Sequence, residues 1–310
     1  MEELDRVLVI FEFFGYFVHF ILGSYFVWRL KSITLIHANL RIILCFKVTQ
    51  YFFVAVGRIG DLVNDAIEKP LIVTNLFCLF FKLLHDAGIF ISAFCPLWVA
   101  AERFCATIMI KTYTERTANV GIWIVGGTHI FCFGLAITLM IYDLNSGLFI
   151  VTESDFSCQF IHLHPNFFPI IWILIGFIFC VSAIILVYLY RYNVLMKTIH
   201  LSTNLSARYQ YSENVRTLRF LVPAFVGLGS LNLLAVFSLP FIYFADSNVQ
   251  FLYLIPIGYG VYFVVYVIAK YDAMRKSFLA DFSCAEAKIR PQSRCVYDAD
   301  LYWKHFEQQW

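Results

Sequence analysis

Seven long apolar segments dominate this sequence. A helix of about 20 apolar residues crosses the roughly 30 Å of hydrocarbon in a bilayer, and in lipid only helices and closed barrels satisfy all their backbone polar groups. We therefore predict an all-α membrane protein that forms a bundle of seven transmembrane helices. The predicted spans are Val7–Trp28, Leu40–Val56, Leu76–Ile110, Asn119–Ile141, Asn166–Tyr190, Leu218–Phe244 and Phe251–Tyr271.

The composition supports a membrane protein and argues against a nucleic-acid-binding protein. Of 310 residues 61% are hydrophobic and 14% are charged, whereas soluble domains are about half apolar and a quarter charged. The net charge of +2 gives no electrostatic footprint for nucleic acid. An acidic start followed by an apolar run of about 22 residues indicates a first membrane helix rather than a cleavable signal peptide. Residues 1–271 are the predicted membrane domain, and 272–310 form a tail.

The basic residues predict the orientation of the bundle. The connections after spans one, three and five and the tail, with the span ends that adjoin them, carry 18 of the 23 Lys and Arg residues. The N-terminus and the even-numbered connections carry Arg6, Arg58 and Lys69. Because short cytoplasmic segments are enriched in Lys and Arg, we predict the N-terminus outside and the C-terminus in the cytoplasm.

This orientation places distinctive residues at both ends of the third span. Glu102 and Arg103 lie at its cytoplasmic end, and Cys78 lies 25 residues earlier, roughly 37 Å away along a helix. Cys78 and Cys158 are the two cysteines predicted at the extracellular face, where thiols can pair. One interpretation leaves the cysteines unpaired and makes Glu102–Arg103 an ordinary interfacial charge pair. The other explains both features together.

That second interpretation is a resemblance to G-protein-coupled receptors. In that family an extracellular loop is joined by a disulfide to the top of the third helix, and an acidic-Arg pair at its other end meets the G protein. The resemblance implies a Cys78–Cys158 disulfide and a switch at Glu102 and Arg103. Span six keeps a proline kink at Pro240, but the sodium-site Asp and Asn-Pro-x-x-Tyr of the large rhodopsin-like class are missing.

Two cytoplasmic stretches narrow the resemblance. Glu102-Arg103-Phe-Cys-Ala-Thr, followed by Lys-Thr-Tyr113, is similar to a signature of nematode chemoreceptors of the Sra superfamily. Arg208-Tyr-Gln, followed by Glu213-Asn-Val-Arg216, is similar to that superfamily's segment before span six. Sre is the preferred subfamily, with Srb and Srab as alternatives. The resemblance implies a sensory receptor that binds a small external ligand and couples to a heterotrimeric G protein through Glu102, Arg103, Tyr113, Arg208 and Arg216.

Polar residues in the outer half of the bundle are the candidates for ligand contact, because ionisable groups inside a membrane are usually buried and functional. Lys82 and Asp86 are four residues apart and can pair on one helix face, with His85 beside them. They either neutralise each other as a structural pair or contact a ligand. Deeper in the bundle, Glu12 is expected to pair with His19, which shares its helix face, or with Lys47.

The tail begins with a stretch suited to a short amphipathic helix on the membrane surface. Cys284 just beyond it is a candidate for palmitoylation, and an unmodified thiol is the alternative. The expected partners are therefore a small-molecule ligand, a G protein and membrane lipids. The resemblance implies a multi-pass protein of the plasma membrane, expressed in sensory neurons.

Other functional classes fit the sequence less well. A transporter or ligand-gated ion channel is the alternative, but seven spans do not divide into two equal repeats. No His-Glu-x-x-His, nucleophile elbow or phosphate loop points to an enzyme. We expect no metal, no cofactor and no enzymatic activity.

Overall fold

The computed structural model describes residues 2–33, 36–66, 71–110, 119–145, 168–199, 205–244 and 253–282. The elements in these ranges are all α-helices, and each bundle helix carries one of the apolar segments found in the sequence. The helices are α1 (Glu2–Ser32), α2 (Ala38–Ala66), α3 (Leu71–Ile108), α4 (Asn119–Asn145), α6 (Phe168–Ile199), α7 (Leu205–Phe244), α8 (Leu254–Lys270) and α9 (Asp272–Phe282).

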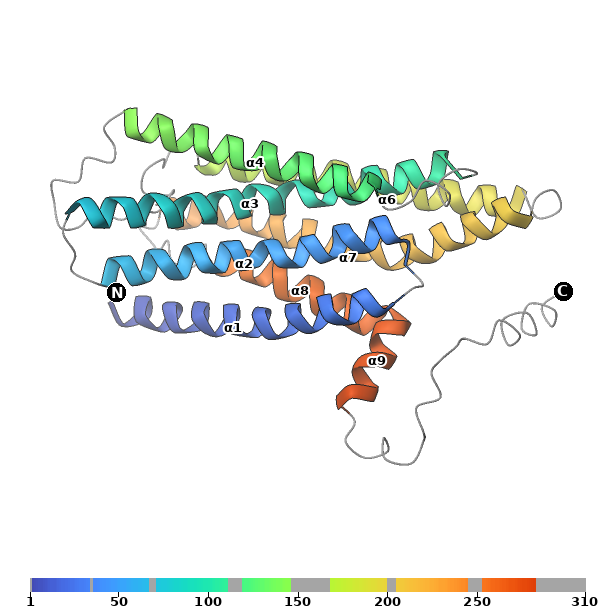
Figure 1. Ribbon diagram of the computed structural model, residues 1–310, viewed down its shortest axis with the longest axis horizontal. Helices are drawn as coiled ribbons and strands as arrows, with labels where there is room; N and C mark the ends of the chain where they lie inside the picture. The colour runs from blue at the N-terminus through green and yellow to red at the C-terminus, as the bar shows by residue number, and fades with distance from the viewer. Residues whose placement is uncertain are drawn as a thin grey trace.

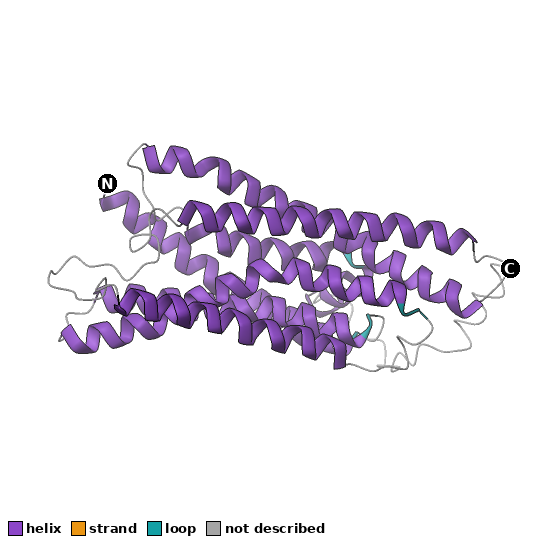
Figure 2. Cartoon of the chain, turned by 90° about the horizontal axis from the view of Figure 1, so that it is seen from above, coloured by secondary structure: helices purple, strands orange, loops and turns teal. Residues whose placement is uncertain are grey.

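The seven helices from α1 to α8 run side by side along one axis, and α9 turns away from them (Figures 1 and 2). Six of the described helices have an apolar stretch long enough to cross a membrane. The pair α8 and α9, bent by 93° between them, is a seventh candidate. The predicted seven-helix membrane bundle is confirmed. We call its two ends the Cys78 end and the Arg103 end, after residues near the two ends of α3.

Several helices extend further than the spans that the sequence predicted. The second span was expected to end at Val56, but α2 continues to Ala66, so Arg58 lies inside the bundle rather than in a connection. Similarly, α4 extends beyond Ile141, and α7 begins at Leu205 rather than Leu218. Polar residues near these ends have partners inside the protein, which allows the helices to continue past the apolar stretches.

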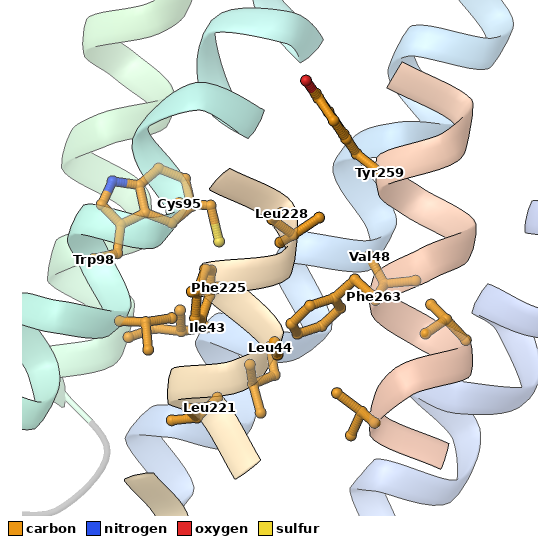
Figure 3. Packing of buried hydrophobic residues seen from close by; sticks show 14 of the residues in the cluster. Ile43, Leu44, Val48, Cys95, Trp98, Leu221, Phe225, Leu228, Tyr259 and Phe263 are labelled. Atoms are coloured by element: carbon orange, nitrogen blue, oxygen red, sulfur yellow. The ribbon is translucent and has the colours of Figure 1, made fainter. Parts of the chain in front are cut away.

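The apolar core includes buried side chains from all seven bundle helices. Figure 3 shows side chains from α2, α3, α7 and α8 meeting around Phe225 of α7 and Phe263 of α8, whose ring centroids are 5.9 Å apart. Trp98 of α3 and Leu44 of α2 belong to the same buried cluster. In lipid, van der Waals packing rather than water exclusion holds such helices together, so close fit matters more than apolarity.

Glycines allow α2 and α3 to come into very close contact. A Cβ on Gly57 would lie 2.6 Å from the backbone nitrogen of His85 and 2.7 Å from the carbonyl oxygen of Phe81. The ring of Phe81 also fills the space beside Gly60. The contacts at Gly57 involve backbone atoms of the neighbouring helix, which cannot rotate away as a flexible side chain would.

The short helix α9 is held against the end of α1. Asp281 accepts hydrogen bonds from Arg29 and from the hydroxyl of Tyr25 (2.7 Å), and Phe278 packs edge-on against Tyr25. Partial burial disfavours the Asp281 carboxylate, but these hydrogen bonds outweigh that effect and hold its pKa below the ordinary value. A helix thus occupies the start of the predicted tail, while the division at residue 271 stays a prediction.

Replacing Gly57 should separate α2 from α3. We expect Gly57→Ala to destabilise the protein by about 1–3 kcal/mol, the usual range for overpacking, because the new methyl group meets backbone. The measurement is thermal unfolding of the purified protein in detergent. Gly126→Ala on α4 is the matched control, since a Cβ added there would have no neighbouring atom within 4 Å. Equal behaviour of the two variants would contradict the close packing.

Candidate functional site

At the Arg103 end, α3 carries a buried ion pair between neighbouring residues. The Nε and Nη2 groups of Arg103 both donate to the carboxylate of Glu102, and the two side chains are 2% and 0% exposed. Two parallel hydrogen bonds between a guanidinium and a carboxylate are a strong, geometrically specific arrangement. The predicted pair is therefore formed, and it lies inside the bundle rather than at its surface.

Hydrogen bonds connect this pair to two other helices. Arg103 Nη1 donates to Asn214 Oδ1 of α7 (3.2 Å), and Asn214 Nδ2 donates to Asn193 Oδ1 of α6 (3.2 Å). Asn193 Nδ2 in turn donates to Thr107 Oγ1 of α3 (2.9 Å). We call Glu102, Arg103, Thr107, Asn193 and Asn214 the Arg103 network. It joins α3, α6 and α7 through buried polar groups.

The sequence missed the two asparagines as part of this site. Asn214 stands inside the motif that favoured a receptor, next to Glu213, which interacts with Arg103 only at longer range. Asn193 gave no signal beyond being a polar residue near a span end. Arg208 and Arg216 lie on α7 outside the network, and Tyr113 falls outside the described residues.

A second group of buried charges lies near the Cys78 end. Lys82 Nζ donates to Asp86 Oδ2 at 2.7 Å, as the four-residue spacing predicted, and also lies 3.3 Å from Asp143 Oδ2 of α4. His85 Nδ1 is 3.5 Å from Asp86 Oδ1. The ring of His85 packs 6.0 Å from that of Tyr253, just before α8. Asp143 was missed because the fourth span was expected to end before it.

Glu12 on α1 has a different partner from those expected. It accepts two hydrogen bonds from Arg58 of α2, at 2.8 and 3.3 Å, and not from His19 or Lys47. The Arg58 guanidinium also stacks 3.7 Å from the ring centroid of Tyr253. Tyr253 thus touches residues of both buried groups. We call Glu12, Arg58, Lys82, His85, Asp86, Asp143 and Tyr253 the Tyr253 cluster.

Lys47 is a buried cation in the middle of α2. Its side chain is fully buried, and its ammonium lies 5.3 Å from the ring centroid of Tyr51 and 5.2 Å from that of Phe263. Within the described part of the chain, its Nζ has no hydrogen-bond partner and no ion pair. Cation–π contact with two rings compensates only part of the cost of removing an ammonium from water.

The remaining predicted sites are only partly within the described residues. Cys78 takes part in a disulfide bond, and the other cysteines described are free thiols. Cys158 and Cys284 lie outside the described residues, so the Cys78–Cys158 pairing and the palmitoylation stay predictions. Pro240 lies inside α7, but its side chain is not described. In the described ranges, no group of three or more His, Cys, Asp or Glu side chains could hold a metal ion.

Almost the whole length of the chain matches one family of known receptors. Residues 3–310 match the model of the serpentine type 7TM GPCR receptor class ab chemoreceptors. The chain belongs to this family. It is a multi-pass membrane protein of the G-protein-coupled receptor type, as the sequence motifs around Arg103 and Arg208 indicated. The match is to class ab, one of the two alternatives named beside Sre, and the preference for Sre is not supported.

A Caenorhabditis elegans protein is similar to part of this chain. It is described as a probable G-protein coupled receptor and is 28% identical over 220 residues, which cover 66% of this chain. The matched region spans 55% of the relative's own length. The similarity supports a nematode serpentine receptor.

The two buried cations of α2 should respond in opposite ways to the same substitution. We expect Lys47→Met to raise the free energy of unfolding by about 1 kcal/mol or more, because it removes an unpaired buried charge. Arg58→Met leaves Glu12 buried without its partner and should cost about 3–5 kcal/mol. Thermal unfolding in detergent measures both. A loss of stability in Lys47→Met comparable to that in Arg58→Met would show that Lys47 has a stabilising partner.

Proposed function

We propose that this receptor binds a small external ligand and activates a heterotrimeric G protein. The observation that carries the proposal is the Arg103 network, in which one buried arginine is held by an acid on its own helix and by Asn214 on α7. Buried charges in a membrane protein are costly unless paired. A charge kept at the end of a helix bundle by a few polar contacts can be released to a partner protein.

The proposed resting state is the closed arrangement of α3, α6 and α7. Separation of α7 from α3 would break the Arg103–Asn214 hydrogen bond and the Asn214–Asn193 bond together, since both converge on one asparagine. Arg103 would then face the gap between the helices. A G protein that binds this open state better than the closed one shifts the population towards it.

The proposed ligand site is the Tyr253 cluster at the Cys78 end, which the predicted orientation puts outside the cell. It includes the candidates Lys82, His85 and Asp86, and adds residues from α1, α2, α4 and the start of α8. A ligand that contacts this cluster would touch helices on several sides of the bundle at once. It could therefore favour one arrangement of the helices over another.

The cellular role follows from the family. We propose that the protein works at the plasma membrane of sensory neurons, with the N-terminus outside. The Cys78 disulfide supports this orientation, because disulfides persist mainly in oxidising compartments. Arg208 and Arg216, which α7 carries near the Arg103 end, belong to the proposed G-protein surface, as does Tyr113.

Removing Asn214 from the network should raise signalling without ligand. Interhelical hydrogen bonds in membranes contribute about 0.6 kcal/mol on average and up to about 1.7. Asn214→Leu is therefore expected to shift the resting equilibrium about 3- to 20-fold towards the open state. The measurement is basal GTPγS binding by a panel of G proteins in membranes that contain equal amounts of receptor.

Two further variants make this test specific. Ser230→Ala, which removes a hydrogen bond within α7 on its exposed face, is the matched control and should leave basal activity unchanged. Glu102→Gln should also raise basal activity, and Glu102→Gln/Arg103→Gln should abolish it without leaving a buried unpaired charge. Basal activation by the double variant equal to that of Glu102→Gln would refute the role of Arg103.

A further inference from the structure

A cleft opens where α7, α8 and α9 meet at the Arg103 end. Its volume is about 360 Å³, within the range of pockets that bind small molecules. Its wall combines cationic and aromatic side chains from the three segments. These are Arg216, Arg219 and Phe220 of α7, Tyr266 and Lys270 of α8, and Tyr271 at the bend before α9.

The cleft carries positive charge on exposed side chains that could bind an anion. The side chains of Arg216, Arg219 and Lys270 are all exposed, and none forms an ion pair within the described ranges. Asp272 also lines the cleft, but its carboxylate is paired with Arg275 at 2.7 Å. Glu213 is the acid that interacts with Arg216 at longer range. Three cations therefore face one opening with little internal compensation.

The cleft lies where the apolar part of the bundle ends. Lys270 is the last residue of α8, and the chain turns by 93° from α8 into α9 (Figure 1). Tyr266 lies one helical turn before Lys270, inside the membrane span. Phe220 packs against Tyr271 with ring centroids 5.0 Å apart. The cationic groups thus adjoin Tyr266, which is partly exposed within the span, and the largely buried ring pair of Phe220 and Tyr271.

We propose that this cleft binds the phosphorylated headgroup of an anionic membrane phospholipid. Lys and Arg side chains at such depth meet the headgroups of the cytoplasmic leaflet, which carries anionic lipids. Guanidinium groups match phosphate oxygens in geometry as well as charge. The aromatic side chains contact the glycerol and the upper acyl chains, which a free phosphate compound lacks. The site shares Arg216 with the proposed G-protein surface but includes no residue of the Arg103 network, and its lipid binding is measured without a G protein.

The test is a lipid titration of the full chain in detergent, followed by native mass spectrometry. The probe is short-chain phosphatidylinositol bisphosphate, with short-chain phosphatidylcholine as the neutral lipid. We expect saturable binding of the anionic lipid with one site. Arg219→Gln/Lys270→Gln should weaken it about 30-fold, the loss expected for two cations near an anionic headgroup. Arg219→Lys/Lys270→Arg keeps both charges and should bind as the unmodified chain does.

The control removes the same charge elsewhere at this end of the bundle. Arg191→Gln/Lys197→Gln changes two basic residues of α6 that do not line the cleft, and it should bind the lipid normally. If lipid binding weakened equally in both double variants, overall charge would explain the effect and the cleft would not be a specific site. Inositol trisphosphate that binds as tightly as the lipid would overturn the lipid assignment. If Arg219→Gln/Lys270→Gln bound the lipid normally but no longer activated a G protein, the cleft would be a contact site for the G protein and the lipid proposal would be wrong.

Discussion

The absence of water in the hydrocarbon region is the constraint on which this structure depends. A charge inside the bundle is costly unless it finds a partner on a neighbouring helix or on its own, and Lys47 is an exception among the described residues. Arg58 meets Glu12 across the interface of α1 and α2, and Lys82 meets Asp86 within α3. These pairs set which faces of the helices point inwards. The Phe-rich exterior does not determine how the helices are rotated, because lipid solvates apolar side chains equally well on every side.

Polar contacts gather at the two ends of the bundle, and close packing joins them. The Tyr253 cluster lies towards the Cys78 end and the Arg103 network towards the other, with the cluster of Figure 3 between them. Glycines such as Gly57 bring helix backbones into contact, so small shifts cannot be absorbed by side chains. A bundle of this kind changes between discrete arrangements more readily than it deforms. That property suits the proposed function, in which a ligand and a G protein act at opposite ends of the bundle.

The basic residues at the Arg103 end of the bundle fall into two groups, those paired with an acid and those without an ion pair. Arg29 is committed to Asp281, which fastens α9 to α1. The cations of the cleft between α7 and α8 lack such a partner among the described residues. Since basic residues at this face also orient the chain in the membrane, their number alone says little about binding. Their position around a cleft lined by aromatic side chains is what favours lipid binding over a role in orientation alone.

The sequence by itself determined the helical class, the number of spans and the contacts that lie within one helix. The Lys82–Asp86 pair followed from the four-residue spacing along α3, because a helix brings such residues together whatever surrounds it. The Glu102–Arg103 pair followed from the receptor motif, since adjacent residues do not share a helix face. The partners of Glu12, Asn214 and Asp143 were decided only by the tertiary structure. Contacts between helices depend on how each helix is rotated and how far it extends. The glycines and buried polar groups of all the helices determine these together, and no single segment encodes them.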